Sequence, residues 1–261
     1  MNSARQWADS LYAARRDRRA ITPPSAADPT LTAADAYAIQ QEYASLILAD
    51  GGSIVGYKLG LTSRPMQQLL GVDQPDYGPV LSGMVVGDGA RLRMDDFIQP
   101  KAEAEIAVFL HSRLRGPGVT AADAAAASAS ASAAIEIVDS RIRDWKITLV
   151  DTIADLASSA AVLLGGRAVA FDGWDPRLCG MVITRNGELE ATGAGAAALG
   201  NPFEAIAWLA NTLAHFDVTL EPGQFIMTGA LHAAFPVRAG DVVRAEFDRL
   251  GAVVVTFEGE A

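Results

Sequence analysis

The sequence predicts an α+β protein in which a small helical N-terminal region precedes a mixed β-sheet. Apolar residues recur at helical spacing over residues 1–50, whereas strand-length apolar runs dominate the second half, with helices inserted between them. The alternation of strands and helices is too irregular for a doubly wound or barrel architecture, and no internal repeat is visible. We therefore expect a helical region over residues 1–75 and a β domain over residues 76–261.

The composition narrows the class of partner. The 261 residues are 50% apolar and carry 21 Lys and Arg against 31 Asp and Glu, for a net charge of −10. This charge repels phosphate backbones and anionic lipids, so we expect neither nucleic acid nor membrane as a partner, whereas divalent cations fit it. The single cysteine, Cys179, cannot form an intramolecular disulfide, and the first residues lack the apolar segment of a secretory signal. We expect a cytoplasmic protein.

Two helices are expected near the N-terminus. Residues 1–20 are amphipathic and basic, with Ala4, Trp7, Ala8 and Leu11 at helical spacing. A second helix begins at Thr32, where Asp35 three residues later completes a capping pair, and it ends before Gly51-Gly52. The residues of its buried stripe recur every three or four positions: Ala36, Ile39, Tyr43, Leu46 and Ile47.

Beyond this point the expected elements follow one another irregularly. A strand, a short helix and a loop are expected over residues 53–60, 65–70 and 74–78 in turn. The Ala and Ser run of residues 120–134 predicts an Ala-rich helix, and further helices fit residues 151–164 and 202–214. Asn186-Gly187 indicates a hairpin turn. The C-terminal strands are expected near residues 225–228, 242–247 and 252–257.

Two acidic residues alternate with apolar ones in residues 100–110. In a strand, Glu103 and Glu105 share one face, about 7 Å apart, because each residue rises roughly 3.3 Å and side chains alternate. The opposite face carries only apolar side chains: Ala104, Ile106, Val108 and Leu110. A solvated outer strand face would explain such a pair equally, so the pair needs a third group to indicate a site.

Glu136 supplies that third carboxylate, because it faces away from the core if Ile135 and Ile137 face toward it. Asp139 lies with the core set or just past the strand end. Three carboxylates suit Mg²⁺ or Mn²⁺, hard ions that prefer oxygen ligands and keep positions open for substrate. Zinc is disfavoured, because the three histidines are isolated and lack ligand spacing: His111, His215 and His232.

Lys58 lies in the middle of an expected strand with Gly56 and Gly60 on either side. An ammonium group there indicates an anionic ligand, although an edge-strand lysine would have the same pattern. The segment lacks the residue order of a phosphate-binding P-loop. The glycines of residues 193–200 have the wrong spacing for a dinucleotide-binding loop.

Five motifs follow one another along the chain: Gly56-Tyr57-Lys58-Leu59-Gly60-Leu61-Thr62-Ser63; Pro75-Asp76-Tyr77-Gly78; Lys101-Ala102-Glu103-Ala104-Glu105-Ile106-Ala107; Glu136-Ile137-Val138-Asp139-Ser140-Arg141 with Asp144-Trp145-Lys146; and Asp151-Thr152-Ile153-Ala154-Asp155. Together they resemble the 2-keto-4-pentenoate hydratase family of the fumarylacetoacetate hydrolase superfamily. The likeness extends from the helix that contains Asp35 to Phe257.

The resemblance implies a fumarylacetoacetate-hydrolase-like catalytic β domain over residues 76–261, a divalent metal and a homo-oligomer. Its implied substrate is a short 2-hydroxy-dienoate, or the 2-oxo tautomer, from the degradation of aromatic or steroid rings. Glu103, Glu105 and Glu136 match the family's metal ligands, which are the same glutamates that strand alternation selects. The other matched positions are Lys58 and Asp76 as catalytic residues, and Leu59, Asp155 and Thr228 as substrate-binding residues.

The implied reaction is hydration, in which water adds to the alkene to give a 4-hydroxy-2-oxo acid. Three carboxylates and one Mg²⁺ leave a charge of −1 before an anionic substrate binds, so a cation is needed, and Lys58 is the candidate. Asp76 would relay protons if its environment raises its pKa.

Two positions depart from the family pattern: Leu156 replaces a usual Asn, and Ala230 replaces a frequent Ser. Both remove hydrogen-bonding groups near the expected pocket. Two alternatives stay open, a 4-oxalocrotonate decarboxylase that uses the same metal site and a non-catalytic partner subunit of a decarboxylase–hydratase complex. The segment Phe225-Ile226-Met227-Thr228-Gly229 resembles the decarboxylases, whereas Asp76 and Asp144-Trp145-Lys146 resemble the hydratases.

Overall fold

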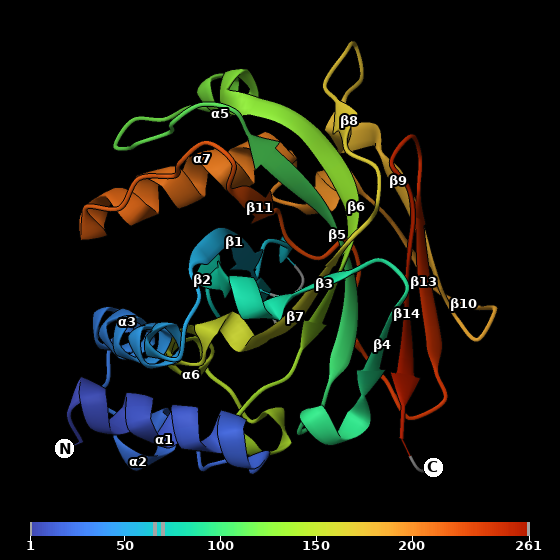
Figure 1. Ribbon diagram of the computed structural model, residues 1–261. Helices are drawn as coiled ribbons and strands as arrows, with labels where there is room; N and C mark the ends of the chain where they lie inside the picture. The colour runs from blue at the N-terminus through green and yellow to red at the C-terminus, as the bar shows by residue number, and fades with distance from the viewer. Residues whose placement is uncertain (1, 65–66, 69–70, 260–261) are drawn as a thin grey trace.

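A computed structural model describes residues 2–64, 67–68 and 71–259 of the chain. Its N-terminal part contains the helices α1 (Ala4–Asp17), α2 (Pro24–Ala27) and α3 (Ala33–Ala49). Capping boxes begin both long helices, at Ser3 for α1 and at Thr32 with Asp35 for α3. The two expected N-terminal helices are therefore confirmed, and they lie against each other at the lower left of Figure 1.

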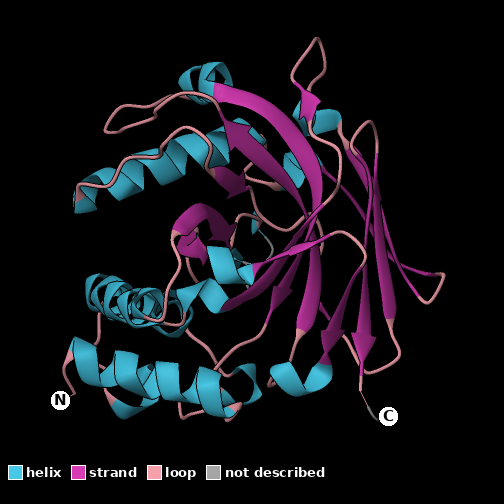
Figure 2. Ribbon diagram, in the orientation of Figure 1, coloured by secondary structure: helices cyan, strands magenta, loops and turns pink. Residues whose placement is uncertain are grey.

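The larger sheet has nine strands and curls around the centre of the molecule (Figure 2). Its main path runs in the order β2 (Asp76–Leu81), β1 (Ile54–Gly60), β11 (Phe225–Met227), β5 (Lys101–Leu110), β6 (Ser128–Val138), β7 (Ser159–Leu164) and β3 (Val85–Gly87). Off this path, β12 (Phe235–Pro236) pairs with β5, and β8 (Val169–Ala170) pairs with β6. Parallel and antiparallel pairs both occur, as expected for a mixed sheet.

The smaller sheet has five strands in the order β10 (Glu188–Ala194), β9 (Gly180–Arg185), β13 (Val242–Phe247), β14 (Gly251–Glu258) and β4 (Ala90–Arg93). It contacts the larger sheet through β6 and β7, at the right of Figure 1. The alternating burial of β13 and β14 follows from this packing, because one face meets the larger sheet and the other meets solvent. The β9–β10 hairpin turns at Asn186-Gly187, as predicted.

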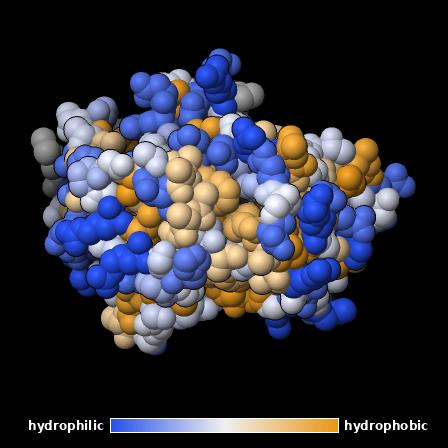
Figure 3. Space-filling view, turned by 90° about the horizontal axis from the view of Figure 1, so that it is seen from above, coloured by the Kyte–Doolittle hydropathy of each residue, from blue (hydrophilic) through white to orange (hydrophobic). Residues whose placement is uncertain are grey.

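The later helices of the described residues pack on other elements. The helix α6 (Leu149–Ala154) packs on α3, and α7 (Pro202–Leu213) packs on α5 (Ala121–Ala127). Polar and apolar side chains are interspersed on the face of the molecule shown in Figure 3. Within the described residues, no helix is both long and apolar enough to cross a bilayer.

The helix expected over residues 120–134 is wrong beyond Ala127. The chain forms only α5 there and then continues as β6. Alanine favours helix locally, but β6 pairs with both β5 and β7 and is buried along most of its length. Pairing on both edges thus outweighs the propensity of the Ala and Ser run.

The helix expected over residues 151–164 is also wrong in its second half. The helix α6 ends at Ala154, a short turn follows, and Ser159 begins β7. The expected loop at residues 74–78 is likewise shorter than predicted, because Asp76 already begins β2, paired with Gly60 of β1. The short helix expected over residues 65–70 falls largely outside the described residues.

Strand β1 lies between β2 and β11, so residues 54–60 of the expected N-terminal region belong to the same sheet as strands of the expected β domain. Where the chain divides into separate domains therefore stays a prediction.

Candidate active site

Three glutamates meet on neighbouring strands at the centre of the larger sheet. In the antiparallel pair of β5 and β6, Glu103 lies directly opposite Glu136, and Glu105 lies opposite Ala134, two residues from Glu136. Side chains two residues apart share a face, so the ladder places all three carboxylates on one side of the sheet. One carboxylate oxygen from each lies within 4.8 Å of the others.

Three of the buried oxygens of this cluster lack hydrogen-bond partners among the described residues. Glu105 and Glu136 are completely buried. Glu105 Oε2 accepts a hydrogen bond of 2.8 Å from the Gly229 amide, but Glu105 Oε1 and both oxygens of Glu136 have no hydrogen-bond partner among the described residues. Buried carboxylates are costly unless a cation compensates them. This set of three hard oxygen donors therefore fits a divalent metal ion.

Lys58 supplies a positive charge beside the cluster. Its Nζ lies 3.3 Å from Glu136 Oε2 and donates a hydrogen bond of 2.9 Å to the Ala157 carbonyl oxygen. Burial alone would lower the pKa of Lys58, but the carboxylates of Glu136 and its neighbours raise the pKa above its ordinary value. Because β1 is paired on both edges, the edge-strand interpretation of this lysine is wrong.

Burial also raises the pKa of two of the glutamates, Glu103 and Glu105. It raises the pKa of Glu103 to about 7, and Lys58 only partly offsets the effect. Burial and the neighbouring Glu136 raise the pKa of Glu105 well above its ordinary value. The single positive charge of Lys58 therefore does not compensate all three carboxylates, and a further cation would stabilise them.

Asp76 approaches Lys58 from β2. Its Oδ2 accepts a hydrogen bond of 3.0 Å from the Thr152 hydroxyl, while Oδ1 has no partner among the described residues. A Cβ atom at Gly60 would lie 2.1 Å from that Oδ1, so glycine is required there for Asp76 to keep its place. Burial raises the pKa of Asp76, as a proton relay requires.

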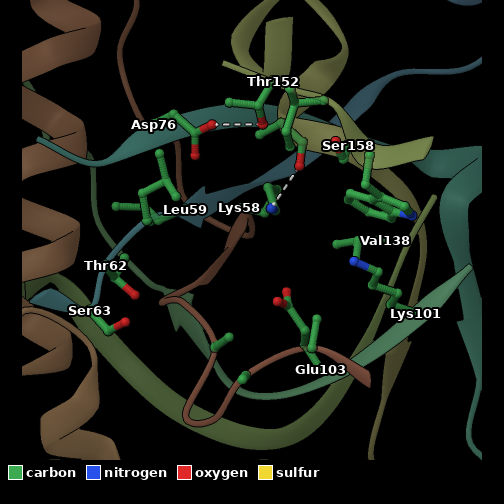
Figure 4. Close-up of a pocket in the computed structure, with 18 of the residues that line it drawn as sticks. Lys58, Leu59, Thr62, Ser63, Asp76, Lys101, Glu103, Val138, Thr152 and Ser158 are labelled. Atoms are coloured by element: carbon green, nitrogen blue, oxygen red, sulfur yellow. Dashed lines mark hydrogen bonds between the residues drawn. The ribbon is translucent and has the colours of Figure 1, made fainter. Parts of the chain in front are cut away.

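Lys58, Asp76 and Glu103 face a cavity of about 240 Å³ (Figure 4), whereas Glu105 and Glu136 lie behind its lining. Besides Lys58, Asp76 and Glu103, its polar and charged lining residues are Thr62, Ser63, Lys101, Thr152, Ser158 and His232. The remaining walls are mainly apolar: Leu59, Gly60, Leu61, Val138, Trp145, Ile147, Ala157, Ala230, Ala233 and Ala234. Charged groups gathered in an otherwise apolar cavity are typical of a small-molecule site.

The structure brings most of the predicted residues together, but not all. Leu59 lines the cavity, and so does Ala230, one of the two departures. Asp155 and Thr228 are absent from the lining. The carboxylate of Asp155 binds the buried Arg141, and the hydroxyl of Thr228 donates to the Ile106 carbonyl at 3.0 Å. Leu156, the other departure, is completely buried in the apolar core.

Several lining residues were not predicted. Lys101 Nζ lies 4.0 Å from the ring centre of Trp145, whose indole nitrogen donates to the Gln99 carbonyl at 3.0 Å. Both lie in motifs that the sequence had singled out, so their motif positions were an available signal. His232 accepts from the Ala104 amide through Nε2 at 2.9 Å, and burial lowers its pKa. Its role is thus structural, and nothing in the sequence indicates that it reaches the cavity.

Comparison with known proteins places this geometry in context. Residues 67–258 match the family described as fumarylacetoacetate (FAA) hydrolase C-terminal. The chain is 44% identical to a 2-keto-4-pentenoate hydratase of Burkholderia vietnamiensis, with 98% of each chain covered. It is 45% identical to a 2-hydroxypent-2,4-dienoate hydratase of Pseudomonas putida, over 80% of this chain and 95% of that one.

A solved structure is similarly close. The 4-oxalocrotonate decarboxylase of Pseudomonas putida G7, complexed with magnesium and adipate, superposes with a TM-score of 0.95 at 37% identity over 97% of each chain. A second structure of that enzyme is complexed with calcium and acetate. The similarity in fold is therefore accompanied by divalent metals in the relative.

Proposed function

The chain belongs to the fumarylacetoacetate hydrolase family, and from that premise we propose that it is a divalent-metal-dependent hydratase. Its substrate would be 2-hydroxypenta-2,4-dienoate, the tautomer of 2-oxopent-4-enoate, or a close homologue, in the degradation of aromatic compounds. The observation that carries the proposal is the buried cluster of Glu103, Glu105 and Glu136 beside Lys58. The identity to hydratases over nearly the whole chain supports the choice of reaction.

Glu103, Glu105 and Glu136 would hold the metal, with Mg²⁺ or Mn²⁺ as the ion. When bound, the ion supplies Lewis-acid stabilisation of negative charge on the carboxylate and 2-oxo oxygens of the substrate. Three carboxylates against one divalent ion leave a charge of −1, so Lys58 is needed to accommodate an anionic substrate. Its ammonium group would hold the substrate carboxylate or stabilise enolate charge.

Asp76 would carry the protons. Hydration requires a proton at carbon 5 of the dienol while the 2-hydroxyl proton leaves to form the 2-oxo group. The oxygen of water then bonds to carbon 4 with one of its hydrogens, and its other proton goes to carbon 3. Burial raises the pKa of Asp76, so it holds a proton more readily than an ordinary aspartate, and Thr152 holds Asp76 by its Oδ2. Leu59 would contact the substrate, because it lines the same cavity.

The test is hydration of 2-hydroxypenta-2,4-dienoate by the purified protein with and without Mg²⁺, followed by identification of 4-hydroxy-2-oxopentanoate. Glu105→Gln should abolish metal-dependent turnover, because it removes a buried ligand. Glu204→Gln, at an exposed position on α7, is the matched control and should keep full activity. Full activity of Glu105→Gln would refute the metal assignment.

A second candidate is 4-oxalocrotonate decarboxylation, favoured by the TM-score of 0.95 to such an enzyme. Release of CO₂ from 2-oxohex-3-enedioate distinguishes it from hydration. A non-catalytic partner subunit would show neither reaction alone and would gain activity or stability only with a second chain.

We also propose that the protein is a homo-oligomer. Four large apolar side chains are exposed among the described residues, and they lie on or beside the smaller sheet: Leu178, Val182, Leu189 and Val242. Exposed apolar side chains on or beside one sheet favour burial against another copy. Light scattering of the wild type and of Leu189→Glu would test this, with dissociation expected for the variant. The cytoplasm stays the predicted compartment.

A further inference from the structure

Ser158 has a buried hydroxyl group that the proposed chemistry does not use. Its side chain lines the cavity with Lys58 and Asp76 and is only 3% exposed. Its Oγ has no hydrogen-bond partner among the described residues. Buried hydroxyls are nearly always hydrogen-bonded, so a free one that faces a cavity indicates a missing acceptor.

The backbone that carries this hydroxyl is strained. Leu156, Ala157 and Ser158 have φ angles of 56°, 49° and 58°, so three successive residues with side chains adopt the left-handed conformation. Such conformations are unfavourable for residues other than glycine and persist only where surrounding structure enforces them. Strain of this kind is concentrated at functional sites, which gives a second reason to examine the turn.

The surrounding structure holds the turn from both ends. Arg141 binds Asp155 before the turn, through Nε to Oδ1 at 2.5 Å, and the Ser159 carbonyl after it, through Nη1 at 3.0 Å. Strand β2 also holds the turn. A Cβ atom at Gly78 would lie 2.5 Å from the Leu156 carbonyl oxygen, so the turn packs tightly on this strand. The position of Asp155 outside the cavity is explained by this role.

The turn places two hydrogen-bond donors beside the same cavity, the Lys58 ammonium group that it binds and its own Ser158 hydroxyl. The Ala157 carbonyl holds the Lys58 ammonium group at 2.9 Å, and the next residue places its hydroxyl on the same cavity. In Figure 4, Glu103 points toward Lys58 from the opposite wall. The amide and carbonyl of Ser158 are already bonded, to the Asp155 carbonyl and the Asp139 amide, so only its hydroxyl is free.

We propose that Ser158 is a substrate-contacting residue whose hydroxyl donates a hydrogen bond to an oxygen of the 2-oxo acid head group, beside Lys58. This rests on the proposed function for the identity of the ligand. An anionic or carbonyl oxygen is the acceptor that a paired ammonium and hydroxyl group recognise. The left-handed turn serves to place both donors.

Ser159 provides a matched control. Its Oγ is also buried and without a partner among the described residues, but it does not line the cavity. We would measure the binding of 2-oxopentanoate, which cannot be hydrated, to the Mg²⁺-loaded protein by calorimetry, together with kcat and KM for the dienoate. Ser158→Ala should weaken binding about tenfold, the effect of one hydrogen bond to a charged acceptor. Ser159→Ala should leave binding and turnover unchanged.

Ser158→Gly distinguishes loss of the hydroxyl contact with the ligand from an effect on the stability of the fold. Glycine accepts the φ of 58° without strain, so this variant should not lower Tm, yet it should lose affinity as Ser158→Ala does. Wild-type affinity and turnover in both variants would overturn the assignment, as would a wild type that binds no 2-oxo acid. If the wild type binds 2-oxopentanoate through Ser158 but hydrates no dienoate, the proposed reaction fails and the contact stands.

Discussion

Lys58 Nζ and Glu136 Oε2 form an ion pair of 3.3 Å in which neither side chain is more than 4% exposed. The pair joins β1 to β6, although β11 and β5 lie between these strands in the sheet. Breaking a buried pair leaves an uncompensated charge, so the two side chains stabilise each other only while both are present. In the proposed reaction, Lys58 would therefore have two parts, an electrostatic one beside Glu136 and a catalytic one.

Lys58→Met should separate these two parts. Turnover should fall about 10²-fold or more, since a preorganised donor at developing negative charge is lost. Mg²⁺ should bind at least as tightly as in the wild type, because a neighbouring positive charge has been removed. Kinetics and metal titration calorimetry measure the two effects. Lys146→Met, whose side chain is 75% exposed, is the control, and loss of metal binding in Lys58→Met would contradict the prediction.

Metal binding should depend on pH in a defined direction. The pKa of Glu103 is about 7, above its ordinary 4.5, so the metal-free folded protein holds a proton there that the unfolded chain releases. Its stability should therefore fall as pH rises from about 4.5 to 7. Metal binds the deprotonated carboxylate, so affinity should increase over the same range. The gain in Tm with Mg²⁺ should be larger at pH 8 than at pH 5.5, and equal gains would contradict this.

Arg141→Met should destabilise the protein by about 3–5 kcal/mol, because it leaves Asp155 buried and uncompensated. Burial already raises the pKa of Asp155 to about 6 even with Arg141 present. Adding Asp155→Asn should restore part of the loss, since the unpaired charge disappears. Urea unfolding of the two single variants and the double variant gives the coupling, and a fully additive double variant would exclude it.

Gly56 and Gly60 should respond differently to alanine. At Gly56 a Cβ atom would lie 2.2 Å from the Phe225 carbonyl oxygen, so β11 must shift, at a cost of about 1–3 kcal/mol. At Gly60 it would meet only the end of the Asp76 side chain, so kcat should fall with a smaller change in Tm. Gly180→Ala, where nothing lies within 4 Å, should change neither quantity. Thermal unfolding and kinetics measure both effects.

The gathering of the three glutamates was predictable because it depends on a local rule. Side chains alternate along any strand, so the positions of Glu103, Glu105 and Glu136 among apolar neighbours fix their faces without knowledge of the fold. The N-terminal helices were predictable for a similar reason, since caps such as Thr32 with Asp35 lie within one turn.

The errors have non-local causes. Residues 128–134 look helical by composition and become strand because β5 and β7 pair with them. Residues 155–158 fit a helical pattern, but Leu156, Ala157 and Ser158 turn left-handed, a conformation that no residue type there announces. Asp155 was expected at the substrate from the family resemblance, and its pairing with Arg141 could not be identified from spacing alone. Ser158 was overlooked for the same reason.

The pairing of β5 with β6 fixes the spacing of the three glutamates. Their separation is set by the backbone hydrogen bonds between these two strands, whereas much of the cavity wall comes from other segments: Thr62 and Ser63, Trp145 and Ile147, and Ala230 with residues 232–234. Those segments can change in sequence without altering the spacing of the glutamates. A scaffold of this kind can change its substrate over evolutionary time while the arrangement of the three glutamates is kept. A one-residue shift in the pairing of β5 with β6 would destroy that arrangement.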